Sequence, residues 1–345
     1  MDNIQEVHRE DGILKDVEKL LKKLISISSV SGDERELGLF LASMLEGDFN
    51  VKTQKLGDRC NVLATIGKPN VLLTTHMDTV PGKLALKEDK QYIYGRGACD
   101  AKGSMAAMIC AGLDAASAGV ENFGLLFDVG EETDLAGIKK ALYIVKPKHV
   151  IVGEPTGLKA GIGQKGVLDV KISSIGKAAH SSTPYEGVSA INRLLDILQK
   201  LRKMNFPHGD LGLTTVNIGR MSGGVVSNII PDYAEAEIEF RTVKPNKGII
   251  RTLERITNKY NFEIICDLDP VPAFDSGIAE VLGAEKIIVP YFTEMFFWSQ
   301  SKAVVFGPGN PKFAHTTEER IDKSELERGR QTYLMALRNS DLILD

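Results

Sequence analysis

The chain is organised around residues 71–104, VLLTTHMDTVPGKLALKEDKQYIYGRGACDAKGS. It begins with an apolar run at residues 71–73, which predicts a buried strand. The strand leads into His76-Met77-Asp78, and a glycine-flanked turn at residues 95–97 later precedes Asp100 and a helix-like run. Two potential metal ligands and a carboxylate that can orient the histidine therefore follow strand ends. Open α/β sheets place their chemistry on such loops.

Length and composition set the broad class of the protein. With 345 residues the chain can bury a substantial core and is expected to hold two domains. Its formal net charge of -4 shows no basic patch for nucleic acid, and no apolar run approaches the roughly 20 residues of a membrane span. The acidic N-terminus does not resemble a secretory signal, and the scattered cysteines favour a reduced cytoplasm: Cys60, Cys99, Cys110 and Cys266.

Strands and helices alternate up to about residue 165, which predicts an α/β domain with a mostly parallel sheet. Apolar spacing indicates a first helix over residues 13–25 and a second over 37–45, with Ser31 and Glu34 spaced as a capping box before it. The later elements expected here are strands at 50–56, 61–66, 123–129 and 148–152 and a helix at 104–118.

The pattern changes from about Gly166. Alternating strands are expected at 167–173, 213–220, 233–242 and 262–267, with helices at 188–204 and 248–260. This predicts a small α+β sandwich over residues 166–271, inserted in a catalytic domain made of residues 1–165 and 272–345. After the return, a strand at 303–306 precedes a glycine turn, and a final helix begins at Lys323.

Five potential metal ligands follow predicted strands or glycine loops of the first domain: His76, Asp100, Glu132, Glu154 and His315. Taken singly, each has an ordinary alternative, such as a core histidine or a solvated acid at a helix start. Taken together, imidazole nitrogens and carboxylate oxygens suit zinc, with cobalt or manganese as alternatives. Two metal ions that share one carboxylate need about five protein ligands, which is the number present.

Two further carboxylates complete this arrangement. Glu131 stands next to Glu132 and is free for proton transfer. Asp78, two residues beyond His76, can orient its imidazole from behind.

These residues lie in motifs that carry a family resemblance. The matched stretches cover almost the whole chain in family order: SVSGDE, THMDTVP, GRGACDAKG, GEET, GEPT, GKAAHSSTPYEGVSAI, GGVVSNIIPD and FGPG…AH. The chain resembles the co-catalytic zinc hydrolases that include acetylornithine deacetylase, succinyl-diaminopimelate desuccinylase, aminoacylase and glutamate carboxypeptidases such as carboxypeptidase G. The resemblance implies that His76 and Glu154 hold one metal ion, that Glu132 and His315 hold the other, and that Asp100 bridges them. It also implies a general base at Glu131 and a cis peptide bond between Asp100 and Ala101.

The resemblance also implies substrate contacts. His180 is expected to reach the active site of a partner subunit and stabilise an oxyanion, which makes a homodimer part of the mechanism. Asn228 and Arg241 match substrate-contacting positions, and a guanidinium suits a substrate carboxylate. Gly307 and Gly309 would let backbone amides approach the substrate. Without the resemblance, His180 is an exposed loop histidine and Arg241 a surface charge at a strand end.

Within the family, HSSTPYEGVSAI and the pair Thr293-Glu294 resemble acetylornithine deacetylase most closely. Glu294 can receive a substrate amino group, although a plain surface carboxylate explains it equally well. The expected reaction is hydrolysis of an N-acyl amino acid, either N-acetylornithine or an acylated lysine or ornithine of arginine or lysine biosynthesis, free or bound to a carrier protein. The alternatives are a desuccinylase, a dipeptidase or a carboxypeptidase. A non-catalytic binding protein is the remote alternative, and it would have lost Glu131 or a ligand.

Overall fold

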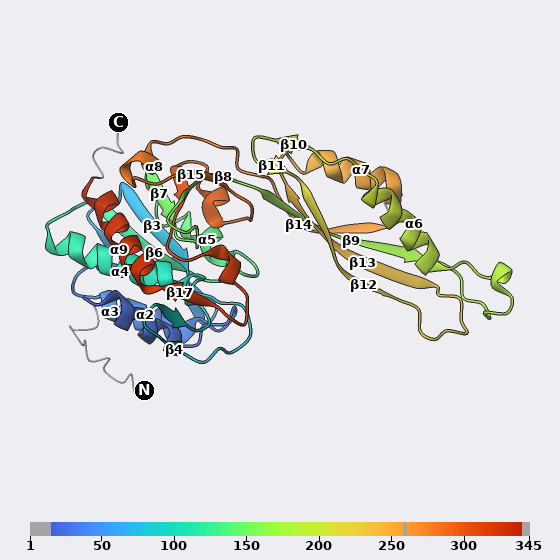
Figure 1. The fold of residues 1–345 in the computed structure, drawn as a ribbon, viewed down its shortest axis with the longest axis horizontal. Coiled ribbons are helices and arrows are strands. Elements are labelled where there is room, and N and C mark those ends of the chain that lie inside the picture. The colour runs from blue at the N-terminus through green and yellow to red at the C-terminus, as the bar shows by residue number, and fades with distance from the viewer. Residues whose placement is uncertain (1–14, 258–260, 340–345) are drawn as a thin grey trace. The chain divides into compact units, whose positions relative to one another are not determined.

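The chain forms two units in this computed structural model, which describes residues 15–257 and 261–339. The first unit holds the described residues up to Ile162, then Phe274–Ile287, and those from Thr293 onward. The second unit holds Gly163–Ala273 and Ile288–Phe292. The ribbon of the chain is drawn in Figure 1. Each unit has its own hydrophobic cluster. The domain limits expected at residues 166 and 271 stay a prediction, because a division by contacts does not show which part folds independently.

The sheet that carries the first unit has the strand order β1-β2-β6-β3-β7-β16-β8-β15. Its strands are β1 (Asn50–Leu56), β2 (Arg59–Ile66), β3 (Val71–His76), β6 (Phe123–Asp128), β7 (His149–Val152), β8 (Ala160–Gln164), β15 (Lys286–Val289) and β16 (Lys302–Val305). The central strands β6, β3, β7 and β16 are parallel, while β1, β2 and β8 pair antiparallel. The predicted α/β class with a mostly parallel sheet is confirmed. A second, three-stranded sheet contains β4 (Lys87–Glu88), β5 (Tyr92–Tyr94) and β17 (Arg320–Asp322).

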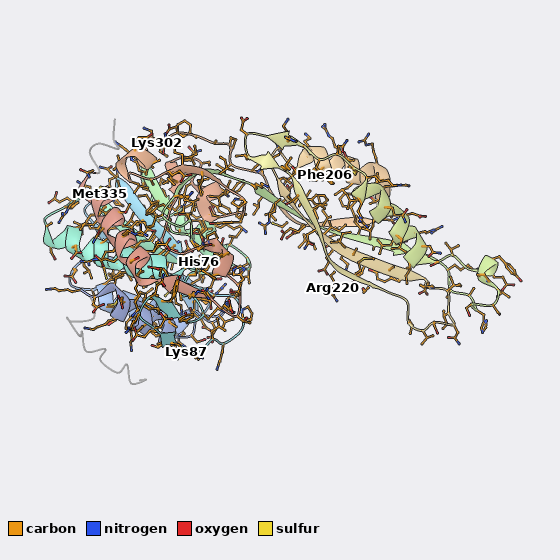
Figure 2. The ribbon with its side chains drawn as sticks, viewed as in Figure 1. His76, Lys87, Phe206, Arg220, Lys302 and Met335 are labelled. Atoms are coloured by element: carbon orange, nitrogen blue, oxygen red, sulfur yellow. The ribbon has the colours of Figure 1, made fainter. Side chains whose placement is uncertain are left out.

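Parallel pairing brings the loops after the central strands to one edge of the sheet. His76, the last residue of β3, is in register with Asp128, the last residue of β6. Thr74 of β3 is likewise in register with Val152, where β7 ends. The predicted strand ends with their polar loops therefore meet, as expected for the carboxyl edge of an open sheet. Figure 2 labels His76 within this unit.

Helices α2, α4 and α9 pack against one another in the first unit (Figure 1). The helices of this unit are α2 (Val17–Ser26), α3 (Arg35–Leu45), α4 (Lys102–Ser117), α5 (Ala136–Ala141), α8 (Ile278–Val281) and α9 (Lys323–Arg338), with short 3-10 turns η2 (Glu294–Trp298) and η3 (Pro311–Phe313). Most residues of α4 are buried, and a Cβ on Gly112 would lie 2.9 Å from Leu125 Cδ1. The small residues of α4 therefore allow its close approach to the sheet. Residues 13 and 14 of the first predicted helix lie outside the described residues.

The predicted capping box before α3 is wrong. Helix α3 begins at Arg35 with no side-chain hydrogen bond from its N-cap residue, Glu34. The Ser31 hydroxyl donates instead to Asp78, and Glu34 pairs with Arg59. Both side chains bind partners that are distant in sequence, so they do not form the predicted cap.

The second unit is a four-stranded antiparallel sheet with two helices. Its strand order is β12-β13-β9-β14, formed by β9 (Gly166–Ile175), β12 (Thr215–Gly223), β13 (Tyr233–Thr242) and β14 (Phe262–Leu268). The remaining elements are α6 (Ala190–Arg202), α7 (Lys247–Thr257), η1 (Pro184–Glu186) and the short pair β10 (His208–Gly209) and β11 (Gly212–Leu213). Alternate residues of β13 are buried against this unit's own cluster. The α+β pattern expected for the insertion is present, and residues 258–260 of its second helix lie outside the described residues.

None of the helices in the described part of the chain combines the length and the apolar character that crossing a membrane requires.

Candidate active site

Asp100 lies between two imidazole rings at the carboxyl edge of the main sheet. Its Oδ1 atom is 3.1 Å from His76 Nε2, and its Oδ2 atom is 3.2 Å from His315 Nε2. Each carboxylate oxygen thus faces a different histidine, which is the arrangement that a bridging ligand needs. The Asp100-Ala101 peptide bond is cis, so that prediction is confirmed. His315 has a φ of 59°, an uncommon left-handed conformation for a residue other than glycine.

Two glutamates complete the groups on either side of Asp100. Glu154 Oε1 lies 3.9 Å from His76 Nε2, and Glu132 Oε1 lies 2.8 Å from His315 Nε2. Potential ligand atoms lie within 4.8 Å of one another in the group His76, Asp100 and Glu154 and in the group Asp100, Glu132 and His315. The structure therefore brings all five predicted ligands together in the first unit, and the two groups share Asp100.

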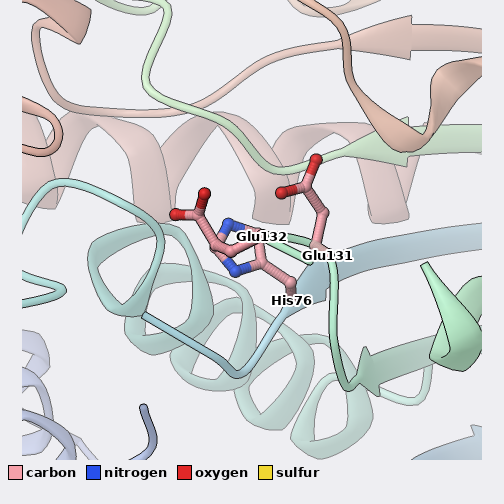
Figure 3. Close-up of side chains that lie close together, drawn as sticks. All are labelled: His76, Glu131 and Glu132. Carbon is pink, nitrogen blue, oxygen red and sulfur yellow. The ribbon is translucent and has the colours of Figure 1, made fainter. Parts of the chain in front are cut away.

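Glu131 lies beside this cluster. Its carboxylate forms a third close group with His76 and Glu132, and Figure 3 shows these three side chains close together. Burial raises the pKa of the Glu131 carboxyl well above its usual range; the charge of His76 opposes this rise and that of Glu132 adds to it. A carboxyl with a raised pKa accepts and keeps a proton more readily than an exposed one.

Asp78 holds the loop that carries both glutamates. Its Oδ1 atom accepts the backbone N–H groups of Gly130 and Glu131, each at 3.0 Å, and its Oδ2 atom accepts that of Glu132 at 3.1 Å and the Ser31 hydroxyl at 2.7 Å. The Nδ1 atom of His76 is 2.9 Å from the Asp78 carbonyl oxygen and 3.5 Å from its carboxylate. Asp78 therefore orients the imidazole chiefly through its backbone, while its carboxylate positions residues 130–132.

The carboxylates of the cluster raise the pKa values of both imidazoles. Burial by itself lowers the pKa of His76, but hydrogen bonds to Asp100 and Asp78 outweigh burial and raise that pKa well above its usual range. Hydrogen bonds to Asp100 and Glu132 raise the pKa of His315 to about 10. Burial works against ionisation of Asp100, yet its contacts with His315 and His76 hold its pKa below the usual range.

The donor set fits two divalent metal ions. It contains two imidazole nitrogens and three carboxylates, a combination that zinc, cobalt or manganese accepts. The Nδ1 atom of His76 hydrogen-bonds a backbone carbonyl oxygen, so its Nε2 atom points toward the carboxylates. Histidines that bind metals in proteins usually have this outer hydrogen bond.

Sequence reasoning missed Glu319, a carboxylate buried behind Asp100. Its Oε1 atom accepts the backbone N–H groups of Cys99 and Asp100, each at 3.1 Å. Its other oxygen accepts Arg96 Nη1 at 2.7 Å. In the segment AHTTEERI no local feature distinguishes Glu319 from the neighbouring solvated Glu318. The sequence therefore gave no signal that identifies Glu319.

Glu294, expected to receive a substrate amino group, lies inside the first unit. Its side chain is 1% exposed and contacts the buried carboxyl of Asp128. Burial and the neighbouring Asp128 raise the pKa of Glu294 well above its usual range. The surface-residue alternative is therefore wrong, and contact with a substrate stays a prediction.

The amides of Gly307 and Gly309 make hydrogen bonds within the first unit. The Gly307 N–H donates to Thr156 Oγ1 at 3.1 Å, and that of Gly309 bonds the Glu325 carboxylate. A Cβ at position 307 would lie 2.4 Å from Ser104 Oγ. Close packing therefore explains Gly307, and its contact with a substrate stays a prediction.

The second unit holds the other three predicted residues. His180 is exposed, and its Nδ1 atom accepts the Ser182 N–H at 3.2 Å, which leaves Nε2 to carry the proton. Asn228 lies on the adjacent segment, where its carbonyl oxygen accepts the Ser181 N–H at 3.0 Å. An exposed Nε2–H is a hydrogen-bond donor suited to an oxyanion.

Arg241 is engaged with a neighbour on the same strand. Its Nε and Nη2 atoms donate to the two carboxylate oxygens of Glu239 at 2.8 and 3.1 Å. A substrate carboxylate would have to replace Glu239 in this fork. The predicted roles of His180, Asn228 and Arg241 stay predictions.

Comparison with known proteins gives the family. Residues 162–263 match the peptidase dimerisation domain of M20 proteins. The chain is 35% identical over 331 residues to a peptidase M20 domain-containing protein of Schizosaccharomyces pombe, an alignment that covers 91% of this chain and 82% of the relative. The chain belongs to the M20 peptidase family.

Other M20 relatives agree in their class of reaction. A probable carboxypeptidase of Aspergillus clavatus is 34% identical, over 90% of this chain and 86% of its own length. The crystal structure of a Staphylococcus aureus tripeptidase superposes with a TM-score of 0.82 at 25% identity, covering 94% of this chain and 98% of the tripeptidase. Amide-bond hydrolysis is therefore the reaction that fits this M20 protein, while the expected affinity to acetylornithine deacetylase stays a prediction.

Proposed function

We propose that this M20 protein uses two divalent metal ions to hydrolyse the amide bond on the α-nitrogen of an amino acid that has a free carboxylate. The sharing of Asp100 between the two ligand groups is the observation that supports this proposal, because a bridging carboxylate is what a two-metal hydrolase requires. N-acetylornithine and acylated lysine or ornithine are the first substrates to test. Zinc is the metal that we propose for both positions.

In this proposal the two metal ions supply Lewis acidity to the amide carbonyl and to the attacking water. Glu131 takes the proton from the water and later gives it to the leaving amine. The Nε2–H of His180, supplied by a partner subunit, donates to the oxyanion of the tetrahedral intermediate. Arg241 exchanges Glu239 for the substrate carboxylate.

Hydrolysis of a C-terminal peptide bond is the second candidate, and the names of the fungal relatives favour it. Both reactions cut an amide at the α-nitrogen of a terminal amino acid, so the same catalytic groups serve either. A panel of N-acetylornithine, N-succinyl-diaminopimelate and dipeptides, analysed for products with one enzyme preparation, separates them. Cleavage of dipeptides alone would replace the deacylase proposal with a carboxypeptidase or dipeptidase.

The variant Glu131→Gln tests the general base. It keeps the side-chain volume but cannot accept a proton, so we expect kcat to fall by about 10²–10⁴-fold with two metal ions per chain retained. Kinetics and elemental analysis of the same sample measure both quantities. Glu121→Gln, the same change at an exposed position before β6, is the control and should be fully active. Full activity of Glu131→Gln would refute the assignment.

A further inference from the structure

We propose that Arg96 and Glu319 form a clamp that fixes the two loops supplying Asp100 and His315, and thereby sets the affinity of the site for metal. This inference rests on the proposed two-metal site. It concerns positioning residues, since neither side chain is among the ligand groups.

The clamp is buried and connects segments more than 200 residues apart. The side chain of Glu319 is 1% exposed and that of Arg96 is 14% exposed. Arg96 Nη1 donates to Glu319 Oε2 at 2.7 Å and to the Thr316 carbonyl oxygen at 3.3 Å, while its Nε donates to the Gly82 carbonyl oxygen at 3.1 Å. Three loops therefore meet at one guanidinium group.

Glu319 also hydrogen-bonds the backbone of Asp100, the proposed bridging residue. Its Oε1 atom accepts the N–H groups of Cys99 and of Asp100 itself, so the backbone that carries the bridging carboxylate is bonded directly to the clamp. The Gly95 N–H also donates to the Glu319 carbonyl oxygen at 3.2 Å.

The same clamp reaches the other metal position. The carbonyl oxygen of Thr316 accepts a hydrogen bond from Arg96, and Thr316 directly follows His315. Glu319 lies four residues after His315. Because Asp100 Oδ2 and His315 Nε2 must converge on one ion, a shift of either loop misplaces a donor. Partners that orient metal ligands typically change metal affinity by about 10–100-fold when they are removed.

Glu319→Gln is the test variant. Its amide oxygen can still accept the two backbone N–H groups, but its amide nitrogen would then face Arg96, donor against donor. We expect the affinity for Zn²⁺, measured by chelator competition on the whole metal-depleted chain, to fall at least about tenfold. We also expect a changed visible absorption spectrum of the Co²⁺-loaded protein, because that spectrum reports ligand geometry.

Asp114→Asn is the matched control. It breaks an ion pair of the same unit, in which Arg330 Nη2 lies 2.6 Å from Asp114 Oδ2 across a comparable sequence separation. This control should lose thermal stability without a change in Zn²⁺ affinity or in the Co²⁺ spectrum. If Glu319→Gln behaves like the control, with wild-type Zn²⁺ affinity, the proposal is overturned.

A second variant and the wild-type chain complete the test. If Glu319→Gln does not fold, Arg96→Lys keeps the charge but loses the planar fork, and unchanged Zn²⁺ affinity in that variant overturns the clamp. Weaker Zn²⁺ binding in Arg96→Lys supports it. If the wild-type chain itself binds no metal, the two-metal function fails instead, so the two failures are distinguishable.

Discussion

At the residue scale, the loop of residues 130–132 is held by one buried carboxylate. Asp78 accepts three consecutive backbone N–H groups, of Gly130, Glu131 and Glu132, besides the hydroxyl of Ser31. Burial opposes the charge of Asp78, but contacts with His76, Ser31 and Glu132 outweigh it and keep its pKa below the usual range. One carboxylate therefore fixes the proposed base and one proposed ligand together.

Asp78→Asn tests this role. The asparagine places an NH₂ group where one oxygen accepts hydrogen bonds, so at least one donor of the loop loses its partner. We expect kcat to fall by about 10–100-fold, measured together with metal content. Asp89→Asn makes the same change at an exposed aspartate that also accepts two backbone N–H groups, and it should leave kcat unaltered. Wild-type turnover of Asp78→Asn would mean that residues 130–132 hold their geometry without it.

The convergence of the proposed ligands was predictable from the sequence, but the support from Glu319 and Arg96 was not. His76 and Glu132 each follow a strand that is apolar enough to recognise, so their position at the sheet edge follows from the pattern. Glu319 and Arg96 act through tertiary hydrogen bonds to distant segments, which no spacing encodes. For Ser31 the local spacing predicted a helix cap, but its hydroxyl donates to the distant Asp78 instead.

At the scale of elements, long periodic segments were predicted well, and strands of two or three residues were not. The strands expected at 50–56 and 233–242 have these bounds in the structure, and the last helix begins at Lys323 as expected, with Asp322 as its N-cap. In contrast, β17 and β5 have three residues each and exist because they pair with each other, which is too short for periodicity to reveal.

Strand β7 contains a buried histidine with a consequence for pH. His149 is 2% exposed, and neither of its ring nitrogens has a hydrogen-bond partner among the residues described. Burial, with the charges of Lys302 and Lys148, lowers its pKa to about 4 from 6.5. His149 therefore binds a proton more tightly in the unfolded chain than in the folded chain. Its contribution to the free energy of unfolding decreases as the pH falls from 6.5 toward 4.

His149→Leu should remove this pH dependence. We expect the loss of unfolding free energy between pH 7 and pH 5 to be smaller in the variant by about 1–2 kcal/mol, as measured by denaturant unfolding at both pH values. His208→Leu, at an exposed histidine of the second unit, is the control and should follow the wild type. Equal pH dependence in wild type and His149→Leu would show that the ring is hydrated or paired in solution.

At the scale of the whole molecule, the change of pattern near Gly166 predicted that a second α+β part interrupts the first. Residues 162–263 match a peptidase dimerisation domain, so we predict that this part forms the contact of a homodimer. The two units were separable in the sequence because one has buried parallel strands and the other has strands with alternating burial. In the proposed mechanism, the second unit contributes to catalysis through His180.

Mixed dimers test whether His180 acts across subunits. His180→Ala removes one oxyanion donor, a loss of about 2.7–4 kcal/mol in transition-state stabilisation, and Glu131→Gln removes the base. Each variant alone should be nearly inactive. In a mixed dimer, the subunit with intact Glu131 receives His180 from its partner and has one complete site. Co-expression with random pairing should therefore restore about a quarter of wild-type activity, in dimers verified by light scattering. Activity equal to the sum of the two separate variants would instead mean that His180 serves its own subunit or takes no part.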